Sequence, residues 1–270
     1  MASIARYVNL WLSLARFSLL GEMAFRGNFV VKVFVELLWL GILLLFNFTL
    51  FKYTSEIADW TQYQYLFFLG SYFALAGLLE MLFLDNCNEF AELVRTGDLD
   101  FFLLRPVDEQ FLVSCRRIDW SCAPNVLLGG GVMLVGLWGM RWSGPWYAVP
   151  AFVAMFACGV ALAYGFLLML TAASVWFMRN QSLMEMWWLF GTLMRYPREI
   201  FQRTGWASIG IIFSTVIPIM LVTNVPANIL ARNLLDPLSV AYTAIATVAV
   251  LAISRWFFRA ALQRYRSASS

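Results

Sequence analysis

Residues 63–84 read YQYLFFLGSYFALAGLLEMLFL, and residues 85–119 directly after them read DNCNEFAELVRTGDLDFFLLRPVDEQFLVSCRRID. The first segment is a continuous apolar run, about as long as the roughly 20 residues that a membrane-spanning helix needs. The second segment is rich in acidic and basic side chains, which are costly to place inside a bilayer. Together they predict a membrane span followed by a folded, water-exposed elbow.

The composition of the whole chain supports this interpretation. Hydrophobic residues make up 61% of the 270 positions and charged residues 13%, whereas about 25% of a soluble domain is charged. Further apolar runs are continuous, unlike the alternating strands of a membrane barrel. We therefore predict an all-α polytopic membrane protein with six transmembrane helices in a single domain, 1–270. The predicted spans are 29–51, 63–84, 120–140, 146–178, 206–222 and 238–258.

The basic residues predict the orientation of the chain in the membrane. Cytoplasmic segments of membrane proteins carry an excess of Lys and Arg. If the N-terminus is inside, only Lys52, Arg141 and Arg232 of the 19 basic residues fall in outer segments. We expect both termini to be cytoplasmic, and we attribute the small net positive charge to topology rather than to a nucleic-acid partner.

The remaining segments lie outside the spans. Residues 1–26 alternate polar and apolar residues at helical spacing and predict an amphipathic interfacial helix; the alternative is an extension of the first span. Within 179–205, the apolar stretch 183–194 is too short to cross a bilayer. It predicts a cytoplasmic or interfacial segment, or a partly re-entrant helix, that is broken at Pro197. The domain then divides into 1–26, spans in 29–84, an elbow over 85–119, spans in 120–178, the segment 179–205, spans in 206–258 and a basic cytoplasmic tail, 259–270.

The cytoplasmic elbow between the second and third spans is expected to be helical and compact. Gly97 can end its first helix in a left-handed conformation. Asp98 has a side chain suited to cap a short helix that extends through Leu104. Pro106 suits the first turn of another helix over 107–114.

The chain lacks the residues of common catalytic and cofactor sites. It contains no histidine and no CxxC pair, and neither of its lysines follows the glycine of a phosphate-binding loop. We expect no catalytic residue, no cofactor site and no metal site here. An enzyme that uses carboxylates alone remains an alternative, as does an ion-coupled secondary transporter.

Two acidic residues, Glu36 and Glu80, lie deepest within predicted spans, close to the cytoplasmic boundary. One interpretation is a polar substrate entrance that also includes Arg116, Arg117 and Asp119. The alternative is ordinary charge pairing at the membrane interface. Farther along, the glycines of 129–131 predict close approach of two helices rather than conformational gating.

Several motifs occur in a recognisable order: an amphipathic start, two spans, an elbow reading VRTGDLDFFLLRP at 94–106, and VIPIMLVTNVPAN at 216–228. In this order the chain resembles the small six-span permease subunits of bacterial ABC-2 type transporters. The resemblance covers nearly the whole chain. The GDLDFFLLRP stretch is its most specific part.

This resemblance implies several partners. A cytoplasmic ABC ATPase dimer would bind ATP and Mg²⁺, and a second permease chain, identical or paralogous, would pair with this one in the lipid bilayer. The elbow would be the coupling helix that docks into the ATPase; the alternative for each of its charges is a solvated face. The residues placed in or beside the docking segment are Glu89, Arg95, Gly97, Asp98, Asp100, Arg105 and Pro106.

The resemblance also implies a direction and a class of cargo. The expected activity is export, such as multidrug efflux, across the bacterial cytoplasmic (inner) membrane. The expected cargo is a hydrophobic or amphipathic compound: a drug, a toxic cation, a lipid or a secondary metabolite. Fold likeness alone does not specify the cargo, because one fold hosts many functions.

Overall fold

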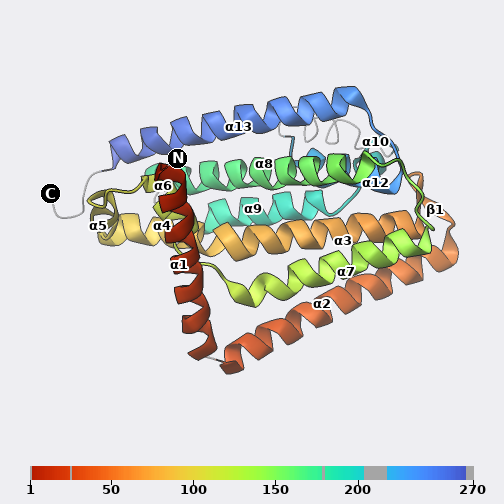
Figure 1. Cartoon of the computed structure of the whole chain (residues 1–270), viewed down its shortest axis with the longest axis horizontal. Coiled ribbons are helices and arrows are strands. Elements are labelled where there is room, and N and C mark those ends of the chain that lie inside the picture. The colour runs from red at the N-terminus through yellow and green to blue at the C-terminus, as the bar shows by residue number, and fades with distance from the viewer. Residues whose placement is uncertain (1, 25, 178–179, 204–217, 266–270) are drawn as a thin grey trace.

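The computed structural model of the protein describes residues 2–24, 26–177, 180–203 and 218–265. Long helices lie side by side in one bundle (Figure 1), which confirms an all-α membrane protein. In chain order the main helices are α1 (Ala2–Ala24), α2 (Arg26–Tyr53), α3 (Gln62–Leu79), α4 (Asp85–Thr96), α5 (Leu99–Leu103), α6 (Glu109–Cys115), α7 (Ala123–Gly139), α8 (Ala148–Phe177), α9 (Asn180–Met194), α10 (Arg198–Arg203), α12 (Leu221–Ala231) and α13 (Pro237–Arg264).

Short elements complete the chain. A two-residue hairpin, β1 (Glu56–Ile57) and β2 (Trp60–Thr61), joins α2 to α3. A π-helical turn, η1 (Glu80–Leu84), joins α3 to α4, and the 3-10 turns η2 (Trp120–Cys122) and η4 (Pro218–Met220) precede α7 and α12. The elbow therefore continues directly from the second span without a break in the helix.

Within the described residues, five helices are long and apolar enough to cross a membrane. The predicted fifth span, 206–222, falls largely on 204–217, which are outside the described residues, so the sixth crossing stays a prediction. The described end of that segment continues into a shorter apolar helix, Pro218–Ala231. The five spanning candidates are Phe29–Tyr53, Gln62–Thr96, Trp120–Gly139, Ala148–Trp176 and Pro237–Arg264.

The segment 180–203 does not stay at the elbow end of the bundle, as a helix lying only on the cytoplasmic membrane surface would. Helix α9 runs along α8 within the bundle (Figure 1), and its Phe190 and Met194 are buried in the largest apolar cluster. Helix α10 then lies at the end of the bundle opposite the elbow, where Glu199 accepts a hydrogen bond from Trp60 Nε1 (3.3 Å). Although α9 is shorter than a spanning helix, its apolar face is buried against α3 and α8, and this burial stabilises it inside the bundle.

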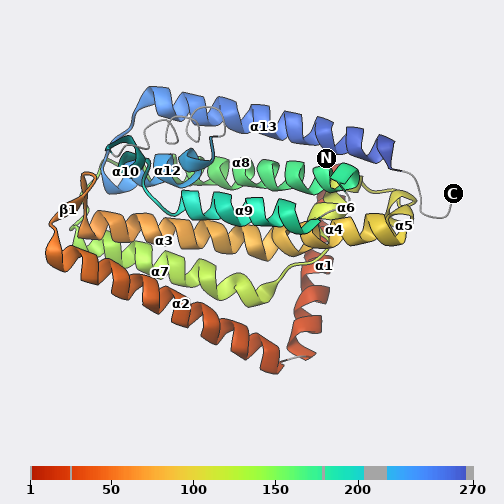
Figure 2. The same cartoon turned by 180° about the vertical axis from the view of Figure 1, so that it is seen from behind.

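Helix α1 is a separate helix and not an extension of the first span. It runs across the elbow end of the bundle instead of along it (Figure 2). Two of its polar side chains bond to the elbow: Tyr7 Oη accepts a hydrogen bond from Asp108 N (3.0 Å), and Ser18 Oγ accepts one from Ile118 N (3.2 Å). Large side chains such as Leu12 and Phe17 are exposed. This arrangement suits a helix at the membrane surface.

The glycines of the third span allow close packing at one position of the three. A Cβ atom on Gly129 would lie 2.4 Å from Ala74 N of α3, whereas one on Gly130 or Gly131 would meet nothing within 4 Å. The backbones of α3 and α7 therefore touch at Gly129, as predicted for this kind of residue.

The elbow consists of three short helices. The predicted helix end at Gly97 is confirmed, whereas the predicted roles of Asp98 and Pro106 are wrong. Gly97 ends α4 with φ 82°, the expected left-handed conformation. Asp98 does not cap α5; instead, its carboxylate accepts a hydrogen bond from Thr96 Oγ1 (2.8 Å). Pro106 lies before α6, which Asp108 caps by accepting a hydrogen bond from Phe111 N (3.1 Å). Asp108, and not Pro106, forms the start of α6 because its non-helical backbone directs the carboxylate toward the free N–H groups of the first turn.

Candidate functional site: the elbow and a charged pocket beside it

Asn86, buried in the first turn of α4, holds the two ends of the elbow together. Its Nδ2 donates to the carbonyl oxygens of Ser114 (3.1 Å) and Arg117 (2.7 Å), and its Oδ1 accepts from Arg117 N (2.9 Å). A buried amide with several partners strongly favours one conformation, because each lost bond would leave a buried polar atom unsatisfied. Asn86 thus closes the elbow into a loop with a defined base.

Three of the predicted site residues form one ion cluster at this base. The Glu89 carboxylate pairs with Arg117 Nη1 (2.5 Å) and with the guanidinium of Arg116. Glu89 was predicted to lie in or beside the docking segment, and the two arginines were predicted either to border a substrate entrance or to form ordinary ion pairs. In the structure all three bind one another, so Glu89 belongs to the internal support of the elbow.

The outward face of the elbow is formed by other residues. Arg95, Asp98, Arg105 and Pro106 are exposed, while Gly97 and Asp100 are half-buried. The sequence analysis missed two apolar members of this face, which are Phe101, 66% exposed, and Leu104, 83% exposed. We call Arg95, Asp98, Phe101, Leu104 and Arg105 the elbow patch.

Neighbouring residues of α5 explain why Phe101 and Leu104 point outward. Leu99 is fully buried, in an apolar cluster with Phe258 of α13. The ring of Phe102 is covered by the guanidinium groups of Arg105 and Arg116, at 5.1 and 5.0 Å, a favourable cation–π geometry. With those residues turned inward, helical spacing directs Phe101 and Leu104 away from the bundle. The run FFLL was the available signal, since it contains more apolar residues than so short a helix can bury.

Helix α6 connects the elbow to two spans. Arg255 of α13 pairs with Asp108 (2.9 Å), and Gln110 Nε2 donates to Tyr164 Oη of α8 (2.9 Å). Ser114 Oγ also lies 2.9 Å from Tyr164 Oη. We call these residues the α6 network. No signal in the sequence could have revealed it, because its members are far apart in the chain and of common residue types.

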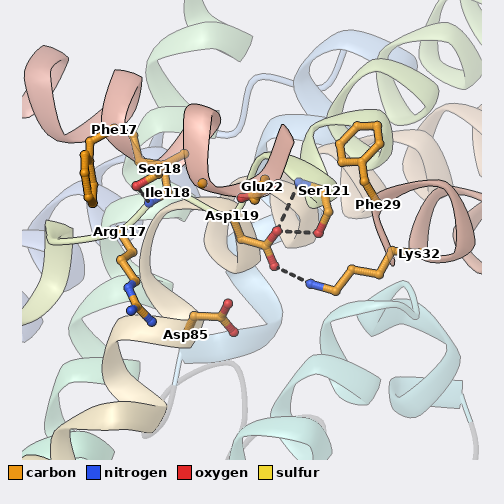
Figure 3. Close-up of a pocket in the computed structure, with 11 residues that line it drawn as sticks. Phe17, Ser18, Glu22, Phe29, Lys32, Asp85, Arg117, Ile118, Asp119 and Ser121 are labelled. Atoms are coloured by element: carbon orange, nitrogen blue, oxygen red, sulfur yellow. Dashed lines mark hydrogen bonds and ion pairs between the residues drawn. The ribbon is translucent and has the colours of Figure 1, made fainter. Parts of the chain in front are cut away.

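A charged pocket, which we call the junction pocket, lies between α1, α2, the start of α4 and the segment before α7. Its volume is about 500 Å³. Figure 3 shows the side chains of Lys32, Asp85, Arg117 and Asp119 approaching one space from different elements. Asp119 pairs with Lys32 Nζ (3.0 Å), and Glu22 Oε1 accepts a hydrogen bond from Trp120 N (2.7 Å).

Two of the three carboxylates that border this pocket, those of Glu22 and Asp119, have pKa values shifted in opposite directions. Burial raises the pKa of Glu22, and the nearby charge of Asp119 adds to the effect despite the hydrogen bond from Trp120 N. Burial would also raise the pKa of Asp119, but hydrogen bonds from Ser121 and Lys32 outweigh it and lower that pKa. Asp119 therefore favours its charged form more strongly than Glu22 does.

The predicted entrance residues divide between two places. Arg117 and Asp119 border the junction pocket. Glu36 and Glu80 line another cavity, of about 300 Å³, between α2, α3 and α9, together with Asn125 and Trp188. Glu36 and Glu80 thus share a cavity whose lining does not include Arg117 or Asp119, although Asp119 N donates a hydrogen bond to Met81 O (2.9 Å), next to Glu80. Among the described residues there is no group of three or more acidic or cysteine side chains arranged to hold a metal ion.

Comparison with known proteins yields one match. Residues 37–269 match a family model described as ABC-2 family transporter protein. No curated protein and no solved structure matches the chain. The matched region begins inside α2, so it includes the elbow and the later spans but not α1.

Proposed function

Because the chain belongs to the ABC-2 family of transporter proteins, we propose that it is the permease subunit of an ATP-driven exporter and that its elbow binds the ATPase. Membership of this family makes it a multi-pass membrane protein that acts as a transport permease rather than as a catalytic enzyme. The family also implies association with an ABC ATPase, which would supply ATP and Mg²⁺ binding. The order of elements agrees, since the elbow lies between the second and third spans.

The elbow patch is the observation that carries this proposal. Phe101 and Leu104 are exposed at the end of the bundle and are flanked by Arg95 and Arg105. Interfaces commonly combine a few apolar anchors and arginines within a polar rim. A soluble ATPase with an apolar groove and acidic residues beside it would fit this surface.

The α6 network supports a route from the ATPase to the spans. Movement of the elbow would pull on Asp108, which is paired with Arg255 of α13, and on Gln110, which is bonded to Tyr164 of α8. We propose that closure of the ATPase pair shifts these two spans. The cavity with Glu36 and Glu80 is our candidate for part of the substrate path, completed by a second permease chain.

We further propose that the cargo is a hydrophobic or amphipathic compound and that the site of action is the bacterial cytoplasmic membrane, with both termini inside. The mixed lining of the cavity with Glu36 and Glu80 supports the proposed class of cargo, because Trp39 and Phe73 also line it. Aromatic walls with a few polar groups are typical of sites for amphipathic ligands.

The test uses the permease expressed together with its ATPase. Phe101→Ser combined with Leu104→Ser, and separately Arg105→Glu, should weaken ATPase binding by about thirtyfold or more and so reduce the amount that co-purifies, since loss of interface anchors costs about 2 kcal/mol or more. The isolated permease should hydrolyse no ATP.

Leu234→Ser provides the control, because Leu234 is exposed in the loop at the opposite end of the bundle. That variant should retain the ATPase. Undiminished co-purification with both elbow variants would remove the elbow patch from the interface.

A further inference from the structure

We propose that the junction pocket binds the ammonium group of a membrane-embedded amphiphile. The pocket lies between α1, which runs across the bundle end, and the first residues of α2 (Figure 3). Phe17, Phe29 and Ile118 give the pocket apolar surface, and five charged side chains border the same space. A ligand with a charged head and an apolar tail suits this combination of surfaces.

The charges select a cation over an anion. Three carboxylates line the pocket, from Glu22, Asp85 and Asp119, against Lys32 and Arg117. Lys32 is paired with Asp119, and Arg117 with Glu89 outside the pocket. Among the described residues, no ion pair joins Glu22 or Asp85 to a cation. Lys32 lies near enough to attract both carboxylates, and Arg117 attracts Asp85, but the lining still has one more carboxylate than basic groups, which favours a positively charged ligand.

One oxygen in the pocket lacks a hydrogen-bond partner. Oε1 of Glu22 accepts from Trp120 N, whereas Oε2 is buried and has no partner. A buried carboxylate oxygen without a partner is costly. An ammonium N–H donated to Glu22 Oε2 would satisfy it. Burial also raises the pKa of Glu22, and a bound cation would offset that effect.

The remaining features favour an organic ammonium over a metal ion. The acidic side chains here do not form a metal-binding group, and a hard cation such as Ca²⁺ needs six or more oxygen ligands. An ammonium needs only about three acceptors and leaves the rest of the molecule to contact the aromatic side chains. Cation–π contact with Phe17 or Phe29 would add to binding.

The pocket extends beyond what the family match covers. Glu22, Lys32 and both aromatic residues precede residue 37, where the match begins.

The ligand could come from two sources with the same chemistry. One is a cationic amphiphile that approaches from the inner leaflet, and the other is the ethanolamine headgroup of a phospholipid. Binding can be measured without the ATPase, so failure of this proposal would leave the proposed function untouched, and the reverse also holds.

The experiment measures binding of radiolabelled dodecylammonium to the full chain in phosphatidylcholine nanodiscs, with empty nanodiscs subtracted. Glu22→Gln with Asp85→Asn should weaken binding about tenfold or more, since a charge-assisted hydrogen bond contributes about 1.5–3 kcal/mol. Dodecyl sulfate, which has the same tail, should not compete. Equal affinity of the double variant and the wild type, or competition by dodecyl sulfate, would overturn the proposal.

Two further variants make the test independent of folding defects. Asp85→Asn alone keeps every printed hydrogen bond of Glu22 and should weaken binding by a smaller factor; unchanged binding by this variant in a monodisperse protein would also count against the site. Glu56→Gln, at the opposite end of the bundle, makes the same change in charge and should have no effect.

A second arm distinguishes the two sources. The chain is purified from membranes that contain phosphatidylethanolamine, and the bound lipid is identified by mass spectrometry. Enrichment of phosphatidylethanolamine that the double variant loses would assign the site to a lipid headgroup. Dodecylammonium binding without such enrichment would assign it to a smaller amphiphile. Absence of both kinds of binding would refute the site.

Discussion

At the scale of single residues, two aspartates in the elbow have different roles although both precede a short helix. The Asp108 carboxylate accepts from Phe111 N, whereas the Asp98 carboxylate accepts from Thr96 Oγ1. Asp108→Ala should therefore lower the free energy of unfolding by about 0.5–2 kcal/mol. Asp98→Ala should cost much less. Thermal unfolding of the detergent-solubilised chain measures both, and an equal loss in the two variants would show that the cap of α6 is unimportant.

Glu22 makes stability depend on pH. Its pKa is raised by burial, so its contribution to stability is present below the unfolded-state pKa and is lost as pH rises through the folded-state pKa. Glu22→Gln removes this loss and keeps an oxygen for Trp120 N. The melting temperature of the variant relative to the wild type should thus be higher at pH 7.5 than at pH 4.5. A relative melting temperature that falls over this range would contradict the assignment.

At the scale of elements, the contact between α3 and α7 depends on a missing side chain. A Cβ at position 129 would lie 2.4 Å from Ala74 N, which belongs to helix backbone and cannot rotate away. Gly129→Ala should force the helices apart at a cost of about 1–3 kcal/mol. Gly130→Ala, where a Cβ meets nothing within 4 Å, should be neutral or stabilising, because alanine favours helix over glycine. The melting temperatures of the two variants test this contact. Equal values for Gly129→Ala and Gly130→Ala would mean that α3 and α7 do not touch at Gly129.

At the scale of the whole molecule, the two ends of the bundle should differ in their access to solvent. We expect Ser55→Cys and Asn233→Cys, both at exposed positions near the hairpin end, to react with an impermeant thiol reagent added outside intact cells. Leu104→Cys in the elbow should react only after permeabilisation. Reaction of Leu104→Cys from outside would invert the topology and place the elbow where no ATPase can reach it.

The sequence alone determined the features that follow from local chemistry. Continuous apolar runs predict spans because backbone polar groups in lipid must be bonded within a helix. The left-handed turn at Gly97 followed from glycine itself, since other residues rarely adopt positive φ. The close approach at Gly129 followed from residue size, although the sequence did not distinguish it from Gly130.

Only the tertiary structure decided features that depend on distant partners. Glu89 could face an ATPase or neighbouring arginines, and the fold of the elbow brings Arg116 and Arg117 to it. Helix α9 is too short to be recognised as a bundle helix until α3 and α8 bury its apolar face. The junction pocket joins Glu22 to Asp85 and Asp119 across the chain. Burial and pairing between remote segments are properties of packing, which local periodicity does not encode.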